Sequence, residues 1–208
     1  MAIKVYGHPY STCTRKVLTT LHEKGQAFEF VMVDLMKGEH KQPAHLARQP
    51  FGVVPALDHD GFALYESRAI IAYLDEALTS GNSLSPREPQ ARGLMNQWTQ
   101  VEQSYFTPSA MKVIMEEMFA PMFGRETNTA RAEEGKAELT RVVEVLDRTL
   151  ANRSFFVGEQ FTLADINYMP YVAFLMGTSG KGLITGAKGV NAWWERVSNR
   201  PSWKKVAG

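Results

Sequence analysis

The stretch from Phe51 to Leu74, FGVVPALDHDGFALYESRAIIAYL, constrains the fold of this chain more than any other. Its first part, Val53 to Leu57, is apolar and rich in β-branched residues around a proline, which predicts a strand. His59-Asp60-Gly61 is a turn signal, and the apolar residues from Phe62 to Tyr65 resume a strand. Because the turn is short, the two strands must run antiparallel. The stretch therefore predicts a hairpin that leads directly into a helix.

The predicted helix after the hairpin begins at an acidic residue followed by a hydroxyl. Ser67 stands where an N-cap belongs, and apolar residues follow at helical spacing from Ala69 to Leu74. The N–H groups and partial positive charge of a helix N-terminus can hold a carboxylate, and Glu66 could hold an ammonium group. The two groups together form the α-carbon end of an amino acid. A hairpin with a well-capped helix explains the same residues, so these residues alone leave both interpretations open.

Composition excludes several classes of function. The 208 residues include 23 basic and 22 acidic side chains, so nothing calls for nucleic acid or an anionic membrane as a partner. No apolar run approaches the ~18 residues that span a bilayer, and the N-terminus has no signal-peptide pattern. The single cysteine, Cys13, excludes an internal disulfide framework and favours a reducing compartment. We therefore expect a cytoplasmic protein.

The first part of the chain alternates between strand and helix patterns. Strands are predicted at Ile3–Tyr6 and Phe28–Val33, and helices at Thr12–Glu23 and Ala44–Arg48. A strand–helix–strand unit implies a parallel pair, whereas the hairpin is antiparallel. Together they predict a four-stranded mixed sheet with helices on its faces.

The pattern changes at the turn-rich segment 79–86, TSGNSLSP, beyond which no strand is predicted. Helices are expected at 88–119 with a kink near Pro108, at 128–151, after Gly158, at 190–198 and at 203–206. The apolar stripe of the second of these includes Leu139, Val142, Val143, Val145, Leu146 and Leu150. The chain is therefore predicted to be α/β plus all-α, with domain 1–78, linker 79–86 and domain 87–208.

The segment FTLADI, residues 161–166, has the pattern of a capping box with a hydrophobic staple. Thr162 would cap the helix, Asp165 would bond back to the cap, and Phe161 would meet Ile166. We interpret this motif as structural.

Two residues at the start of the first helix could carry chemistry. Ser11 is interpreted either as an ordinary N-cap or as a hydroxyl that donates to a ligand anion at the end of the first strand. Cys13 lies in the first turn, where the helix dipole would lower the pKa of a thiol, although burial against the helix is the favoured interpretation. No acidic partner accompanies His8, which argues against a hydrolase triad.

Two further groups are ambiguous from the residues alone. His40 and Lys41 form a small cationic pair that reads as solvated surface. Pro55 cannot donate to a strand ladder, and if its bond to Val54 were cis the backbone of Val54 could pair with an extended peptide.

Several motifs, in order along the whole chain, resemble those of the cytosolic glutathione S-transferases. They are GHPYSTCTRKVLTTLHEKG, LMKGEHKQPAHLARQPFGVVPAL, LYESRAIIAYL and FTLADINYMPY. The chain is most similar to the phi class, known from plants, which carries a serine after His-Pro and a Gly-Glu-His-Lys loop. The resemblance implies a thioredoxin-like first domain with a cis peptide bond before Pro55, and a helical second domain. It also implies a homodimer that needs glutathione and no metal.

The same resemblance implies a role for each candidate residue. Ser11 would donate to the glutathione sulfur as the catalytic residue, and Val54 beside Pro55 would pair with the cysteinyl part. His40 and Lys41 would hold the glycine carboxylate, and Glu66 and Ser67 the γ-glutamyl end. The expected reaction is conjugation of glutathione to small hydrophobic electrophiles, with hydroperoxide reduction as a second activity. Candidates for the electrophile site are Tyr10, Met111, Met115, Met118, Phe119 and Met122.

Two positions depart from the phi pattern. Val53 stands where glutamine is usual, which would remove a polar contact to glutathione, and Tyr10 stands where alanine is usual. Tyr6 and Tyr10 are alternatives to Ser11 as the activating hydroxyl. Cys13 leaves open a thiol transferase, and a carrier of the ligandin type is the non-catalytic alternative.

Overall fold

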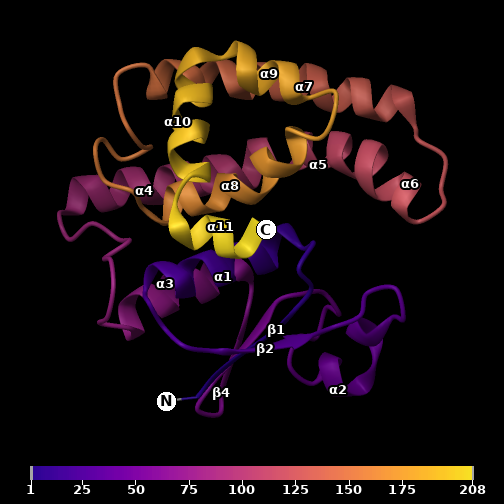
Figure 1. Ribbon diagram of the computed structural model, residues 1–208, viewed down its shortest axis with the longest axis vertical. Helices are drawn as coiled ribbons and strands as arrows, with labels where there is room; N and C mark the ends of the chain where they lie inside the picture. Colours follow the sequence, from indigo (N-terminus) through magenta and orange to yellow (C-terminus); the bar gives the residue numbers. More distant parts are fainter. Residues whose placement is uncertain (1, 208) are drawn as a thin grey trace. The chain divides into compact units, whose positions relative to one another are not determined.

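The computed structural model describes residues 2–207, which divide into two compact units (Figure 1). The first unit contains the described residues up to Ser85 together with those from Arg200 onward, and the second runs from Pro86 to Asn199. The last helix, which the sequence assigned to the second domain, therefore packs with the first.

The first unit is built on a four-stranded mixed sheet of order β2-β1-β3-β4, as predicted. β1 pairs with β2 in parallel and with β3 antiparallel, and β3 pairs antiparallel with β4. The strands are β1 (Ile3–Gly7), β2 (Glu29–Met32), β3 (Ala56–His59) and β4 (Phe62–Tyr65). The helical elements are α1 (Thr12–Glu23), the 3₁₀ turn η1 (Glu39–Lys41), α2 (Pro43–Leu46), α3 (Ser67–Ala77) and α11 (Pro201–Ala207).

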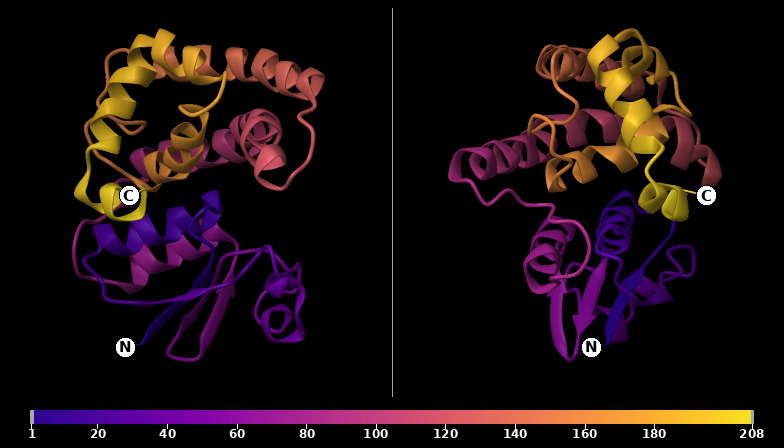
Figure 2. Two further views of the ribbon diagram at one scale, coloured as in Figure 1. Left: turned by 45° about the vertical axis from the view of Figure 1, so that its right-hand side comes forward. Right: turned by 60° about the vertical axis from the view of Figure 1, so that its left-hand side comes forward.

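Helices α1 and α3 lie side by side on one face of this sheet (Figures 1 and 2). They bury Val17 and Leu21 from α1 and Ile71 and Leu74 from α3. From β1, Val5 has no exposed surface. The apolar stripes of the two helices therefore form the core that holds the strand ends in place.

The hairpin differs from its prediction at both boundaries. The Val54–Pro55 bond is cis, as expected, and β3 begins only after it, at Ala56 rather than at Val53. Proline has no N–H to give to a ladder, which explains the later start. His59 belongs to β3, and the turn is the two-residue pair Asp60-Gly61, whose φ angles are 52° and 88°. Positive φ at both positions is the geometry of a type I′ hairpin turn.

The second unit is helical. Its elements are α4 (Pro89–Val101), the π-helical turn η2 (Glu102–Phe106), α5 (Thr107–Ile114), the π-helical turn η3 (Met115–Phe119), α6 (Ala120–Met122), α7 (Thr129–Leu150), α8 (Leu163–Leu175), α9 (Lys181–Gly186) and α10 (Lys188–Ser198). The π-helical turn η2 lies just before Pro108, whose missing N–H cannot complete a normal α-helical turn, and the kink expected there stays a prediction. The sequence did not predict α9, which is short and contains two glycines.

The predicted stripe of α7 is largely buried, with one error. Leu139, Val143, Leu146 and Leu150 are buried, whereas Val145 is 41% exposed. Val145 is next to the buried Leu146 in sequence but points to another side of the helix, because adjacent helical residues are about 100° apart. Asn128 caps α7 by accepting a hydrogen bond from the N–H of Arg131 at 3.0 Å.

The capping box of α8 is confirmed, and its acid has a wider role. Asp165 Oδ2 accepts from the N–H of Thr162 at 2.8 Å, which closes the box. Asp165 Oδ1 accepts from Trp193 Nε1 at 2.9 Å and from the N–H of Phe156 at 3.2 Å. Burial raises the pKa of Asp165, whereas these hydrogen bonds lower it; burial has the larger effect, and the pKa is about 6. One carboxyl therefore joins α8, α10 and the loop before α8. The staple contact between Phe161 and Ile166 stays a prediction.

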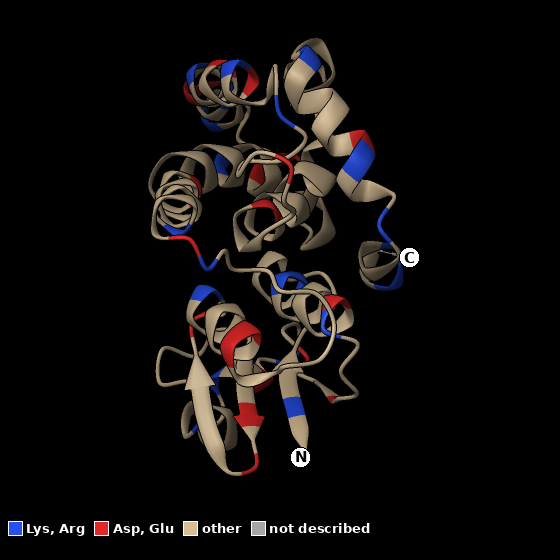
Figure 3. Ribbon diagram, turned by 90° about the vertical axis from the view of Figure 1, so that its left-hand side faces the viewer, with Lys and Arg blue, Asp and Glu red and all other residues tan. Residues whose placement is uncertain are grey.

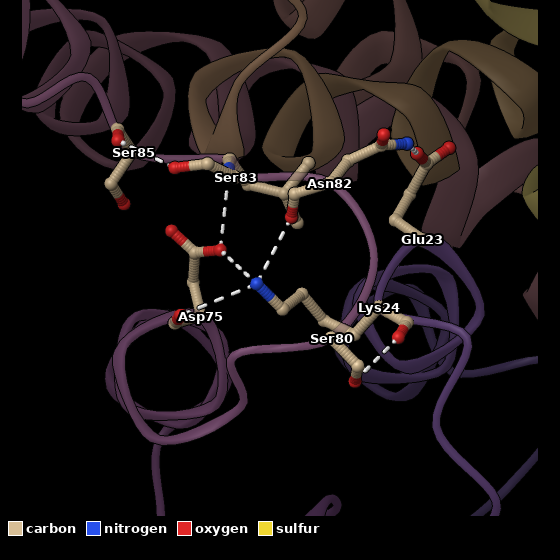
Figure 4. A network of polar contacts seen from close by, with 8 residues as sticks. Glu23, Lys24, Asp75, Ser80, Asn82, Ser83 and Ser85 are labelled. Carbon is tan, nitrogen blue, oxygen red and sulfur yellow. Dashed lines mark hydrogen bonds and ion pairs between the residues drawn. The ribbon is translucent and has the colours of Figure 1, made fainter.

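A polar network explains why the linker segment belongs to the first unit (Figure 4). Lys24 Nζ lies 3.0 Å from Asp75 Oδ1 and donates to the carbonyl of Asn82 at 3.0 Å. Asp75 Oδ1 also accepts from the N–H of Leu84 at 3.0 Å. Because both charges are buried, each is compensated within this network.

The end of α1 anchors the C-terminal helix in a similar way. Arg200 makes two hydrogen bonds to the carboxylate of Glu23, at 2.7 and 2.8 Å, and Ser202 donates to the same group. Burial would raise the pKa of Glu23, but the bonds from Arg200, Ser202 and Asn82 hold it below its ordinary value. This paired carboxylate ties α11 to α1, which is why the last helix belongs to the first unit.

Acidic and basic residues are mixed along the chain. In Figure 3 acidic and basic residues are scattered over the elements of both units. Among the described residues, no helix combines the length and apolarity needed to cross a membrane.

Candidate functional site

Sheet register brings three segments of the first unit to one edge of the sheet. Tyr6 near the end of β1 lies opposite Ala56 at the start of β3, and Ala56 lies opposite Tyr65 at the end of β4. Three segments therefore meet the sheet at neighbouring points: the loop after β1, the segment before β3 and the residues after β4. Three of the predicted groups lie on these segments, which sequence separation alone would not have placed together.

Ser11 is the N-cap of α1. Its Oγ accepts a hydrogen bond from the N–H of Thr14 at 3.2 Å, and its own N–H donates to the carbonyl of His8 at 2.9 Å. A serine hydroxyl has one donor and two acceptor sites, so capping the helix leaves its O–H available to a ligand. The two interpretations of Ser11 are therefore compatible, and the hydroxyl lies at the positive end of the α1 dipole.

The alternative residues beside Ser11 have distinct environments. Tyr10 is 51% exposed, and the guanidinium of Arg15 lies 5.9 Å from the centre of its ring. The guanidinium of Arg48 lies 4.4 Å from the centre of the Tyr6 ring. Cys13 is partly exposed, which corrects the interpretation that it is buried in helix packing.

The turn that carries His40 and Lys41 packs against the chain just before Val53. Lys41 Nζ donates to the carbonyl of Phe51 at 3.2 Å. Gly52 has a φ of 61°, and a Cβ there would lie 2.9 Å from the carbonyl oxygen of His40 and 2.8 Å from Cδ of Lys41. Sequence reasoning missed Gly52, although a glycine beside the predicted strand was the available signal.

His40 has an unmet hydrogen-bonding atom at this turn. Its Nδ1 is buried and has no partner among residues 2–207. Burial, followed by the nearby charges of Lys41 and His45, lowers the pKa of His40 below its ordinary value. A neutral imidazole beside a lysine suits a carboxylate, because the lysine supplies the charge and the ring can supply a hydrogen bond.

The segment before β3 is held by contacts to Val53. His45 Nε2 lies 2.7 Å from the carbonyl oxygen of Val53, and the N–H of Val53 donates to Gln49 Oε1 at 3.3 Å. The side chain of Val53 is 47% exposed. Val54, next in the chain, comes before the first paired residue of β3, so it lies outside the pairing of the sheet.

The start of α3 corrects one detail of the prediction. Glu66, not Ser67, is the N-cap, and Ser67 is the first helical residue and is 3% exposed. Glu66 has φ 72° and ψ 108°, a conformation that non-glycine residues rarely adopt. Such strain costs about 1–3 kcal/mol and gathers at functional sites. This backbone conformation turns the chain from β4 into α3 and leaves the side chain of Glu66 exposed at the positive end of the helix.

The apolar candidates of the second unit lie on one continuous helical segment. Met111 belongs to α5, and Met115, Met118 and Phe119 to η3, and all four are partly exposed. The ring of Phe119 packs edge-on against that of Phe174, with centroids 5.5 Å apart. Met122, in α6, is 53% exposed.

Replacing Gly52 with alanine is expected to weaken binding at this turn. Alanine is strained at this left-handed φ, and its methyl group would displace the backbone of His40. The KM for a ligand held by His40 and Lys41 should therefore rise roughly tenfold. Steady-state kinetics at varied ligand concentration measure the change. Gly25→Ala is the control, because its φ is 62° and a Cβ there meets nothing within 4 Å. An equal KM in the two variants would show that Gly52 does not position the turn.

Comparison with known proteins gives matches to both units. Residues 1–76 match the glutathione S-transferase N-terminal domain, and residues 110–201 match the glutathione S-transferase C-terminal domain. A glutathione S-transferase of Silene vulgaris is 40% identical to this chain over 210 residues, which cover 99% of this chain and 97% of the relative. Glutathione S-transferase F9 of Arabidopsis thaliana is 39% identical over 208 residues, covering 99% and 96%.

Solved structures agree with these matches. The crystal structure of glutathione transferase F7 from Populus trichocarpa has a TM-score of 0.95 at 39% identity, and the alignment covers 99% of this chain and 97% of that one. Glutathione S-transferase I from maize, solved with an atrazine glutathione conjugate, has a TM-score of 0.90 at 30% identity, covering 99% and 96%.

Proposed function

Because this chain belongs to the glutathione S-transferase family, in its phi class, we propose that it transfers glutathione to small hydrophobic electrophiles through a thiolate stabilised by Ser11. It is an enzyme that uses glutathione as co-substrate, and its first unit is thioredoxin-like. The observation that carries the proposal is the position of the Ser11 hydroxyl at the N-terminus of α1, with its proton available to a ligand.

The proposed glutathione site uses the edge of the sheet in the first unit. Glu66 and the N-terminus of α3, with Ser67, bind the ammonium and carboxylate of the γ-glutamyl end. The backbone of Val54, beside Pro55, pairs with the cysteinyl part. His40 and Lys41 bind the glycine carboxylate. The unpartnered Nδ1 of His40 and the strained φ of Glu66 support these assignments, because each is explained by a bound ligand.

The proposed reaction needs no general base in the site. The thiol proton leaves to solvent, and the Ser11 hydroxyl donates to the resulting thiolate. The sulfur then forms a bond to the electrophilic carbon, and a leaving group departs with the electron pair of its bond. We propose that the apolar face of Met111, Met115, Met118 and Phe119 contacts the electrophile, with Tyr10 as a further contact. The maize structure was solved with a ligand of this kind, a glutathione conjugate of atrazine.

One experiment separates this enzyme from a carrier. Retention on immobilised glutathione is measured together with conjugation of 1-chloro-2,4-dinitrobenzene by the purified chain. We expect both retention and turnover. Retention without turnover would favour a ligandin-like carrier, and loss of both would refute the proposed site. Reduction of cumene hydroperoxide in the same preparation tests the second activity.

A thiol transferase is the second candidate, because Cys13 is partly exposed in the first turn of α1. Its test is reduction of a glutathione mixed disulfide by wild type and Cys13→Ala. Activity that depends on Cys13, with conjugation absent, would favour this candidate over the first.

We also propose a homodimer in the cytoplasm. Its support is an exposed apolar group on the first unit, in which Phe51 is 67% exposed and lies edge-on to Tyr65 with ring centroids 6.1 Å apart. Aromatic residues are enriched at protein interfaces relative to the rest of the surface. Light scattering gives the mass of wild type and Phe51→Ser, and we expect a dimer that the substitution weakens. A monomeric wild type would refute it.

A further inference from the structure

Two buried polar side chains hold the chain just before Pro55. His45 lies in α2 and is 5% exposed, and Gln49 follows the end of that helix and is 1% exposed. Neither has a role in the glutathione site proposed above. Polar side chains are rarely buried unless they make hydrogen bonds. The bonds that these two residues make therefore indicate what they do.

Together the two side chains occupy both polar backbone atoms of Val53. His45 Nε2 lies 2.7 Å from the carbonyl oxygen of Val53. Because a carbonyl only accepts, the ring must donate, which places a proton on Nε2. Gln49 Oε1 accepts from the N–H of Val53 at 3.3 Å. In a sheet a neighbouring strand would bond these atoms, but Val53 precedes β3, so side chains take that place.

The contacts to Val53 also orient the next residue. The carbonyl of Val53 and the N–H of Val54 belong to one planar peptide group, so a bond to the carbonyl sets the direction of that N–H. On its other side Val54 precedes Pro55, which restricts it to extended backbone angles. His45 and Pro55 therefore restrain the backbone of Val54 from both sides.

His45 could instead act on the turn η1, which carries His40 and Lys41. The N–H of His45 donates to the carbonyl of Gln42, the residue after η1, at 3.0 Å. That bond uses backbone atoms, so it survives substitution of the His45 side chain. The bond to Val53 is made by the imidazole and is lost. The geometry therefore favours an effect of the side chain on Val53 over an effect on η1.

Gln49 carries a further observation. Its Nε2 is buried and has no hydrogen-bond partner among residues 2–207. A buried donor without a partner destabilises a fold, so an apolar side chain of the same size would suit packing better. The amide is explained if its Oε1 is needed at the N–H of Val53. A positioning role therefore accounts for a side chain that packing alone disfavours.

We propose that His45 and Gln49 are positioning residues for glutathione, which orient the backbone of Val54 for the cysteinyl part by holding Val53. The inference rests on the proposed glutathione site and adds two residues that do not touch the ligand. Neither should alter the thiolate, because Ser11 stabilises it from another segment.

The test compares two ligands that differ only in the glycine. S-hexylglutathione and S-hexyl-γ-glutamylcysteine are titrated calorimetrically into wild type, His45→Phe and Gln49→Met. Each substitution keeps the approximate size of the side chain and removes its bond to Val53. We expect each variant to bind both ligands more weakly by about the same factor, roughly fivefold to tenfold. The KM for glutathione should rise by a similar factor, with kcat within about twofold of wild type.

Two further variants separate positioning from stability. His45→Gln brings an amide N–H close to the place of Nε2 and should restore most of the affinity. His59→Phe is the matched control, because His59 is also a buried histidine of the first unit but lies at the other end of β3, 2.9 Å from the hydroxyl of Tyr73. It should leave both affinities unchanged, even if thermal unfolding shows that it lowers stability as much as His45→Phe.

The possible failures are distinguishable. A wild type that binds neither ligand would refute the proposed glutathione site itself. If wild type binds, equal affinity in His45→Phe and Gln49→Met would refute only the positioning role. A loss confined to S-hexylglutathione would overturn the inference by assigning the two residues to the glycine end. An equal loss in His59→Phe would show that the effect is one of stability.

Discussion

Replacing Ser11 with alanine is expected to lower kcat/KM for glutathione conjugation roughly 10- to 150-fold near pH 7. The loss corresponds to a hydrogen bond to a charged group, worth about 1.5–3 kcal/mol. It should appear as a rise in the pKa of the bound thiol, measured from the pH dependence of kcat/KM or from thiolate absorbance. The KM for glutathione should change little, because the serine acts on the thiolate and not on the ends of the tripeptide.

The free energy that Ser11 and the helix N-terminus can supply is large enough to stabilise the thiolate. A free thiol has a pKa of about 8.5, and lowering it to about 6.5 requires about 2.7 kcal/mol in favour of the thiolate. One charged hydrogen bond contributes about 1.5–3 kcal/mol and a helix N-terminus up to about 1 kcal/mol. The Ser11 hydroxyl and α1 together can therefore supply the whole effect.

Ser11 has a second, structural role, and its effect on stability must be distinguished from its effect on the thiol. Ser11 also caps α1 through the N–H of Thr14, so alanine should lower the free energy of unfolding by about 1 kcal/mol. Ser11→Thr keeps both the cap and the hydroxyl and should restore most of the activity. Tyr10→Phe removes a neighbouring phenol and should leave the thiol pKa unchanged. Full activity in Ser11→Ala would transfer the role to Tyr10, Tyr6 or Cys13.

Replacing Asp165 with alanine is expected to lower the free energy of unfolding by about 3–5 kcal/mol. Its carboxyl is fully buried and accepts from the N–H groups of Thr162 and Phe156 and from Trp193 Nε1. Removing it leaves these donors unmet inside the unit, and each unmet donor costs about 1–3 kcal/mol. Urea unfolding measures the loss. Glu144→Ala, an exposed acid on α7, should stay within about 0.5 kcal/mol of wild type.

Asp165 should also make stability depend on pH. Burial raises its pKa to about 6 from 3.8, so the folded chain holds this proton where the unfolded chain has lost it. The stability of wild type relative to Asp165→Asn should therefore fall as pH rises from about 4 to about 6, and level off above that range. Unfolding free energies of both proteins across this range test the sign. A relative stability that rises with pH would show that the hydrogen bonds outweigh burial and hold the pKa low.

Local patterns predicted much of the fold, and the reason differs from element to element. The capping box at Thr162 and Asp165 and the N-cap at Ser11 could be predicted because caps depend on contacts within four residues. The hairpin could be predicted because turn residues specify their own backbone angles. The start of β3 was placed too early, because a run of apolar residues does not show which of them pair.

Other features depend on parts of the chain that are distant in sequence. Ser67 looked like the N-cap, but the path from β4 into α3 gives that position to Glu66. The last helix looked like part of the second domain, but Glu23 binds Arg200 across most of the chain. The partial exposure of Cys13 likewise follows from packing that no local pattern contains.

By itself the sequence determined which residues could carry the chemistry, because a serine cap, a cationic pair and an acidic residue before a helix are local features. Only the tertiary structure decided that the segments bearing Ser11, Val54 and Glu66 start from one edge of the sheet, through the pairing of Tyr6 with Ala56 and of Ala56 with Tyr65. It also revealed the atoms of His40 and Gln49 that have no partner within residues 2–207. Strand register and side-chain burial arise from contacts between distant residues, so the stretch from Phe51 to Leu74 could predict its own hairpin but not its neighbours.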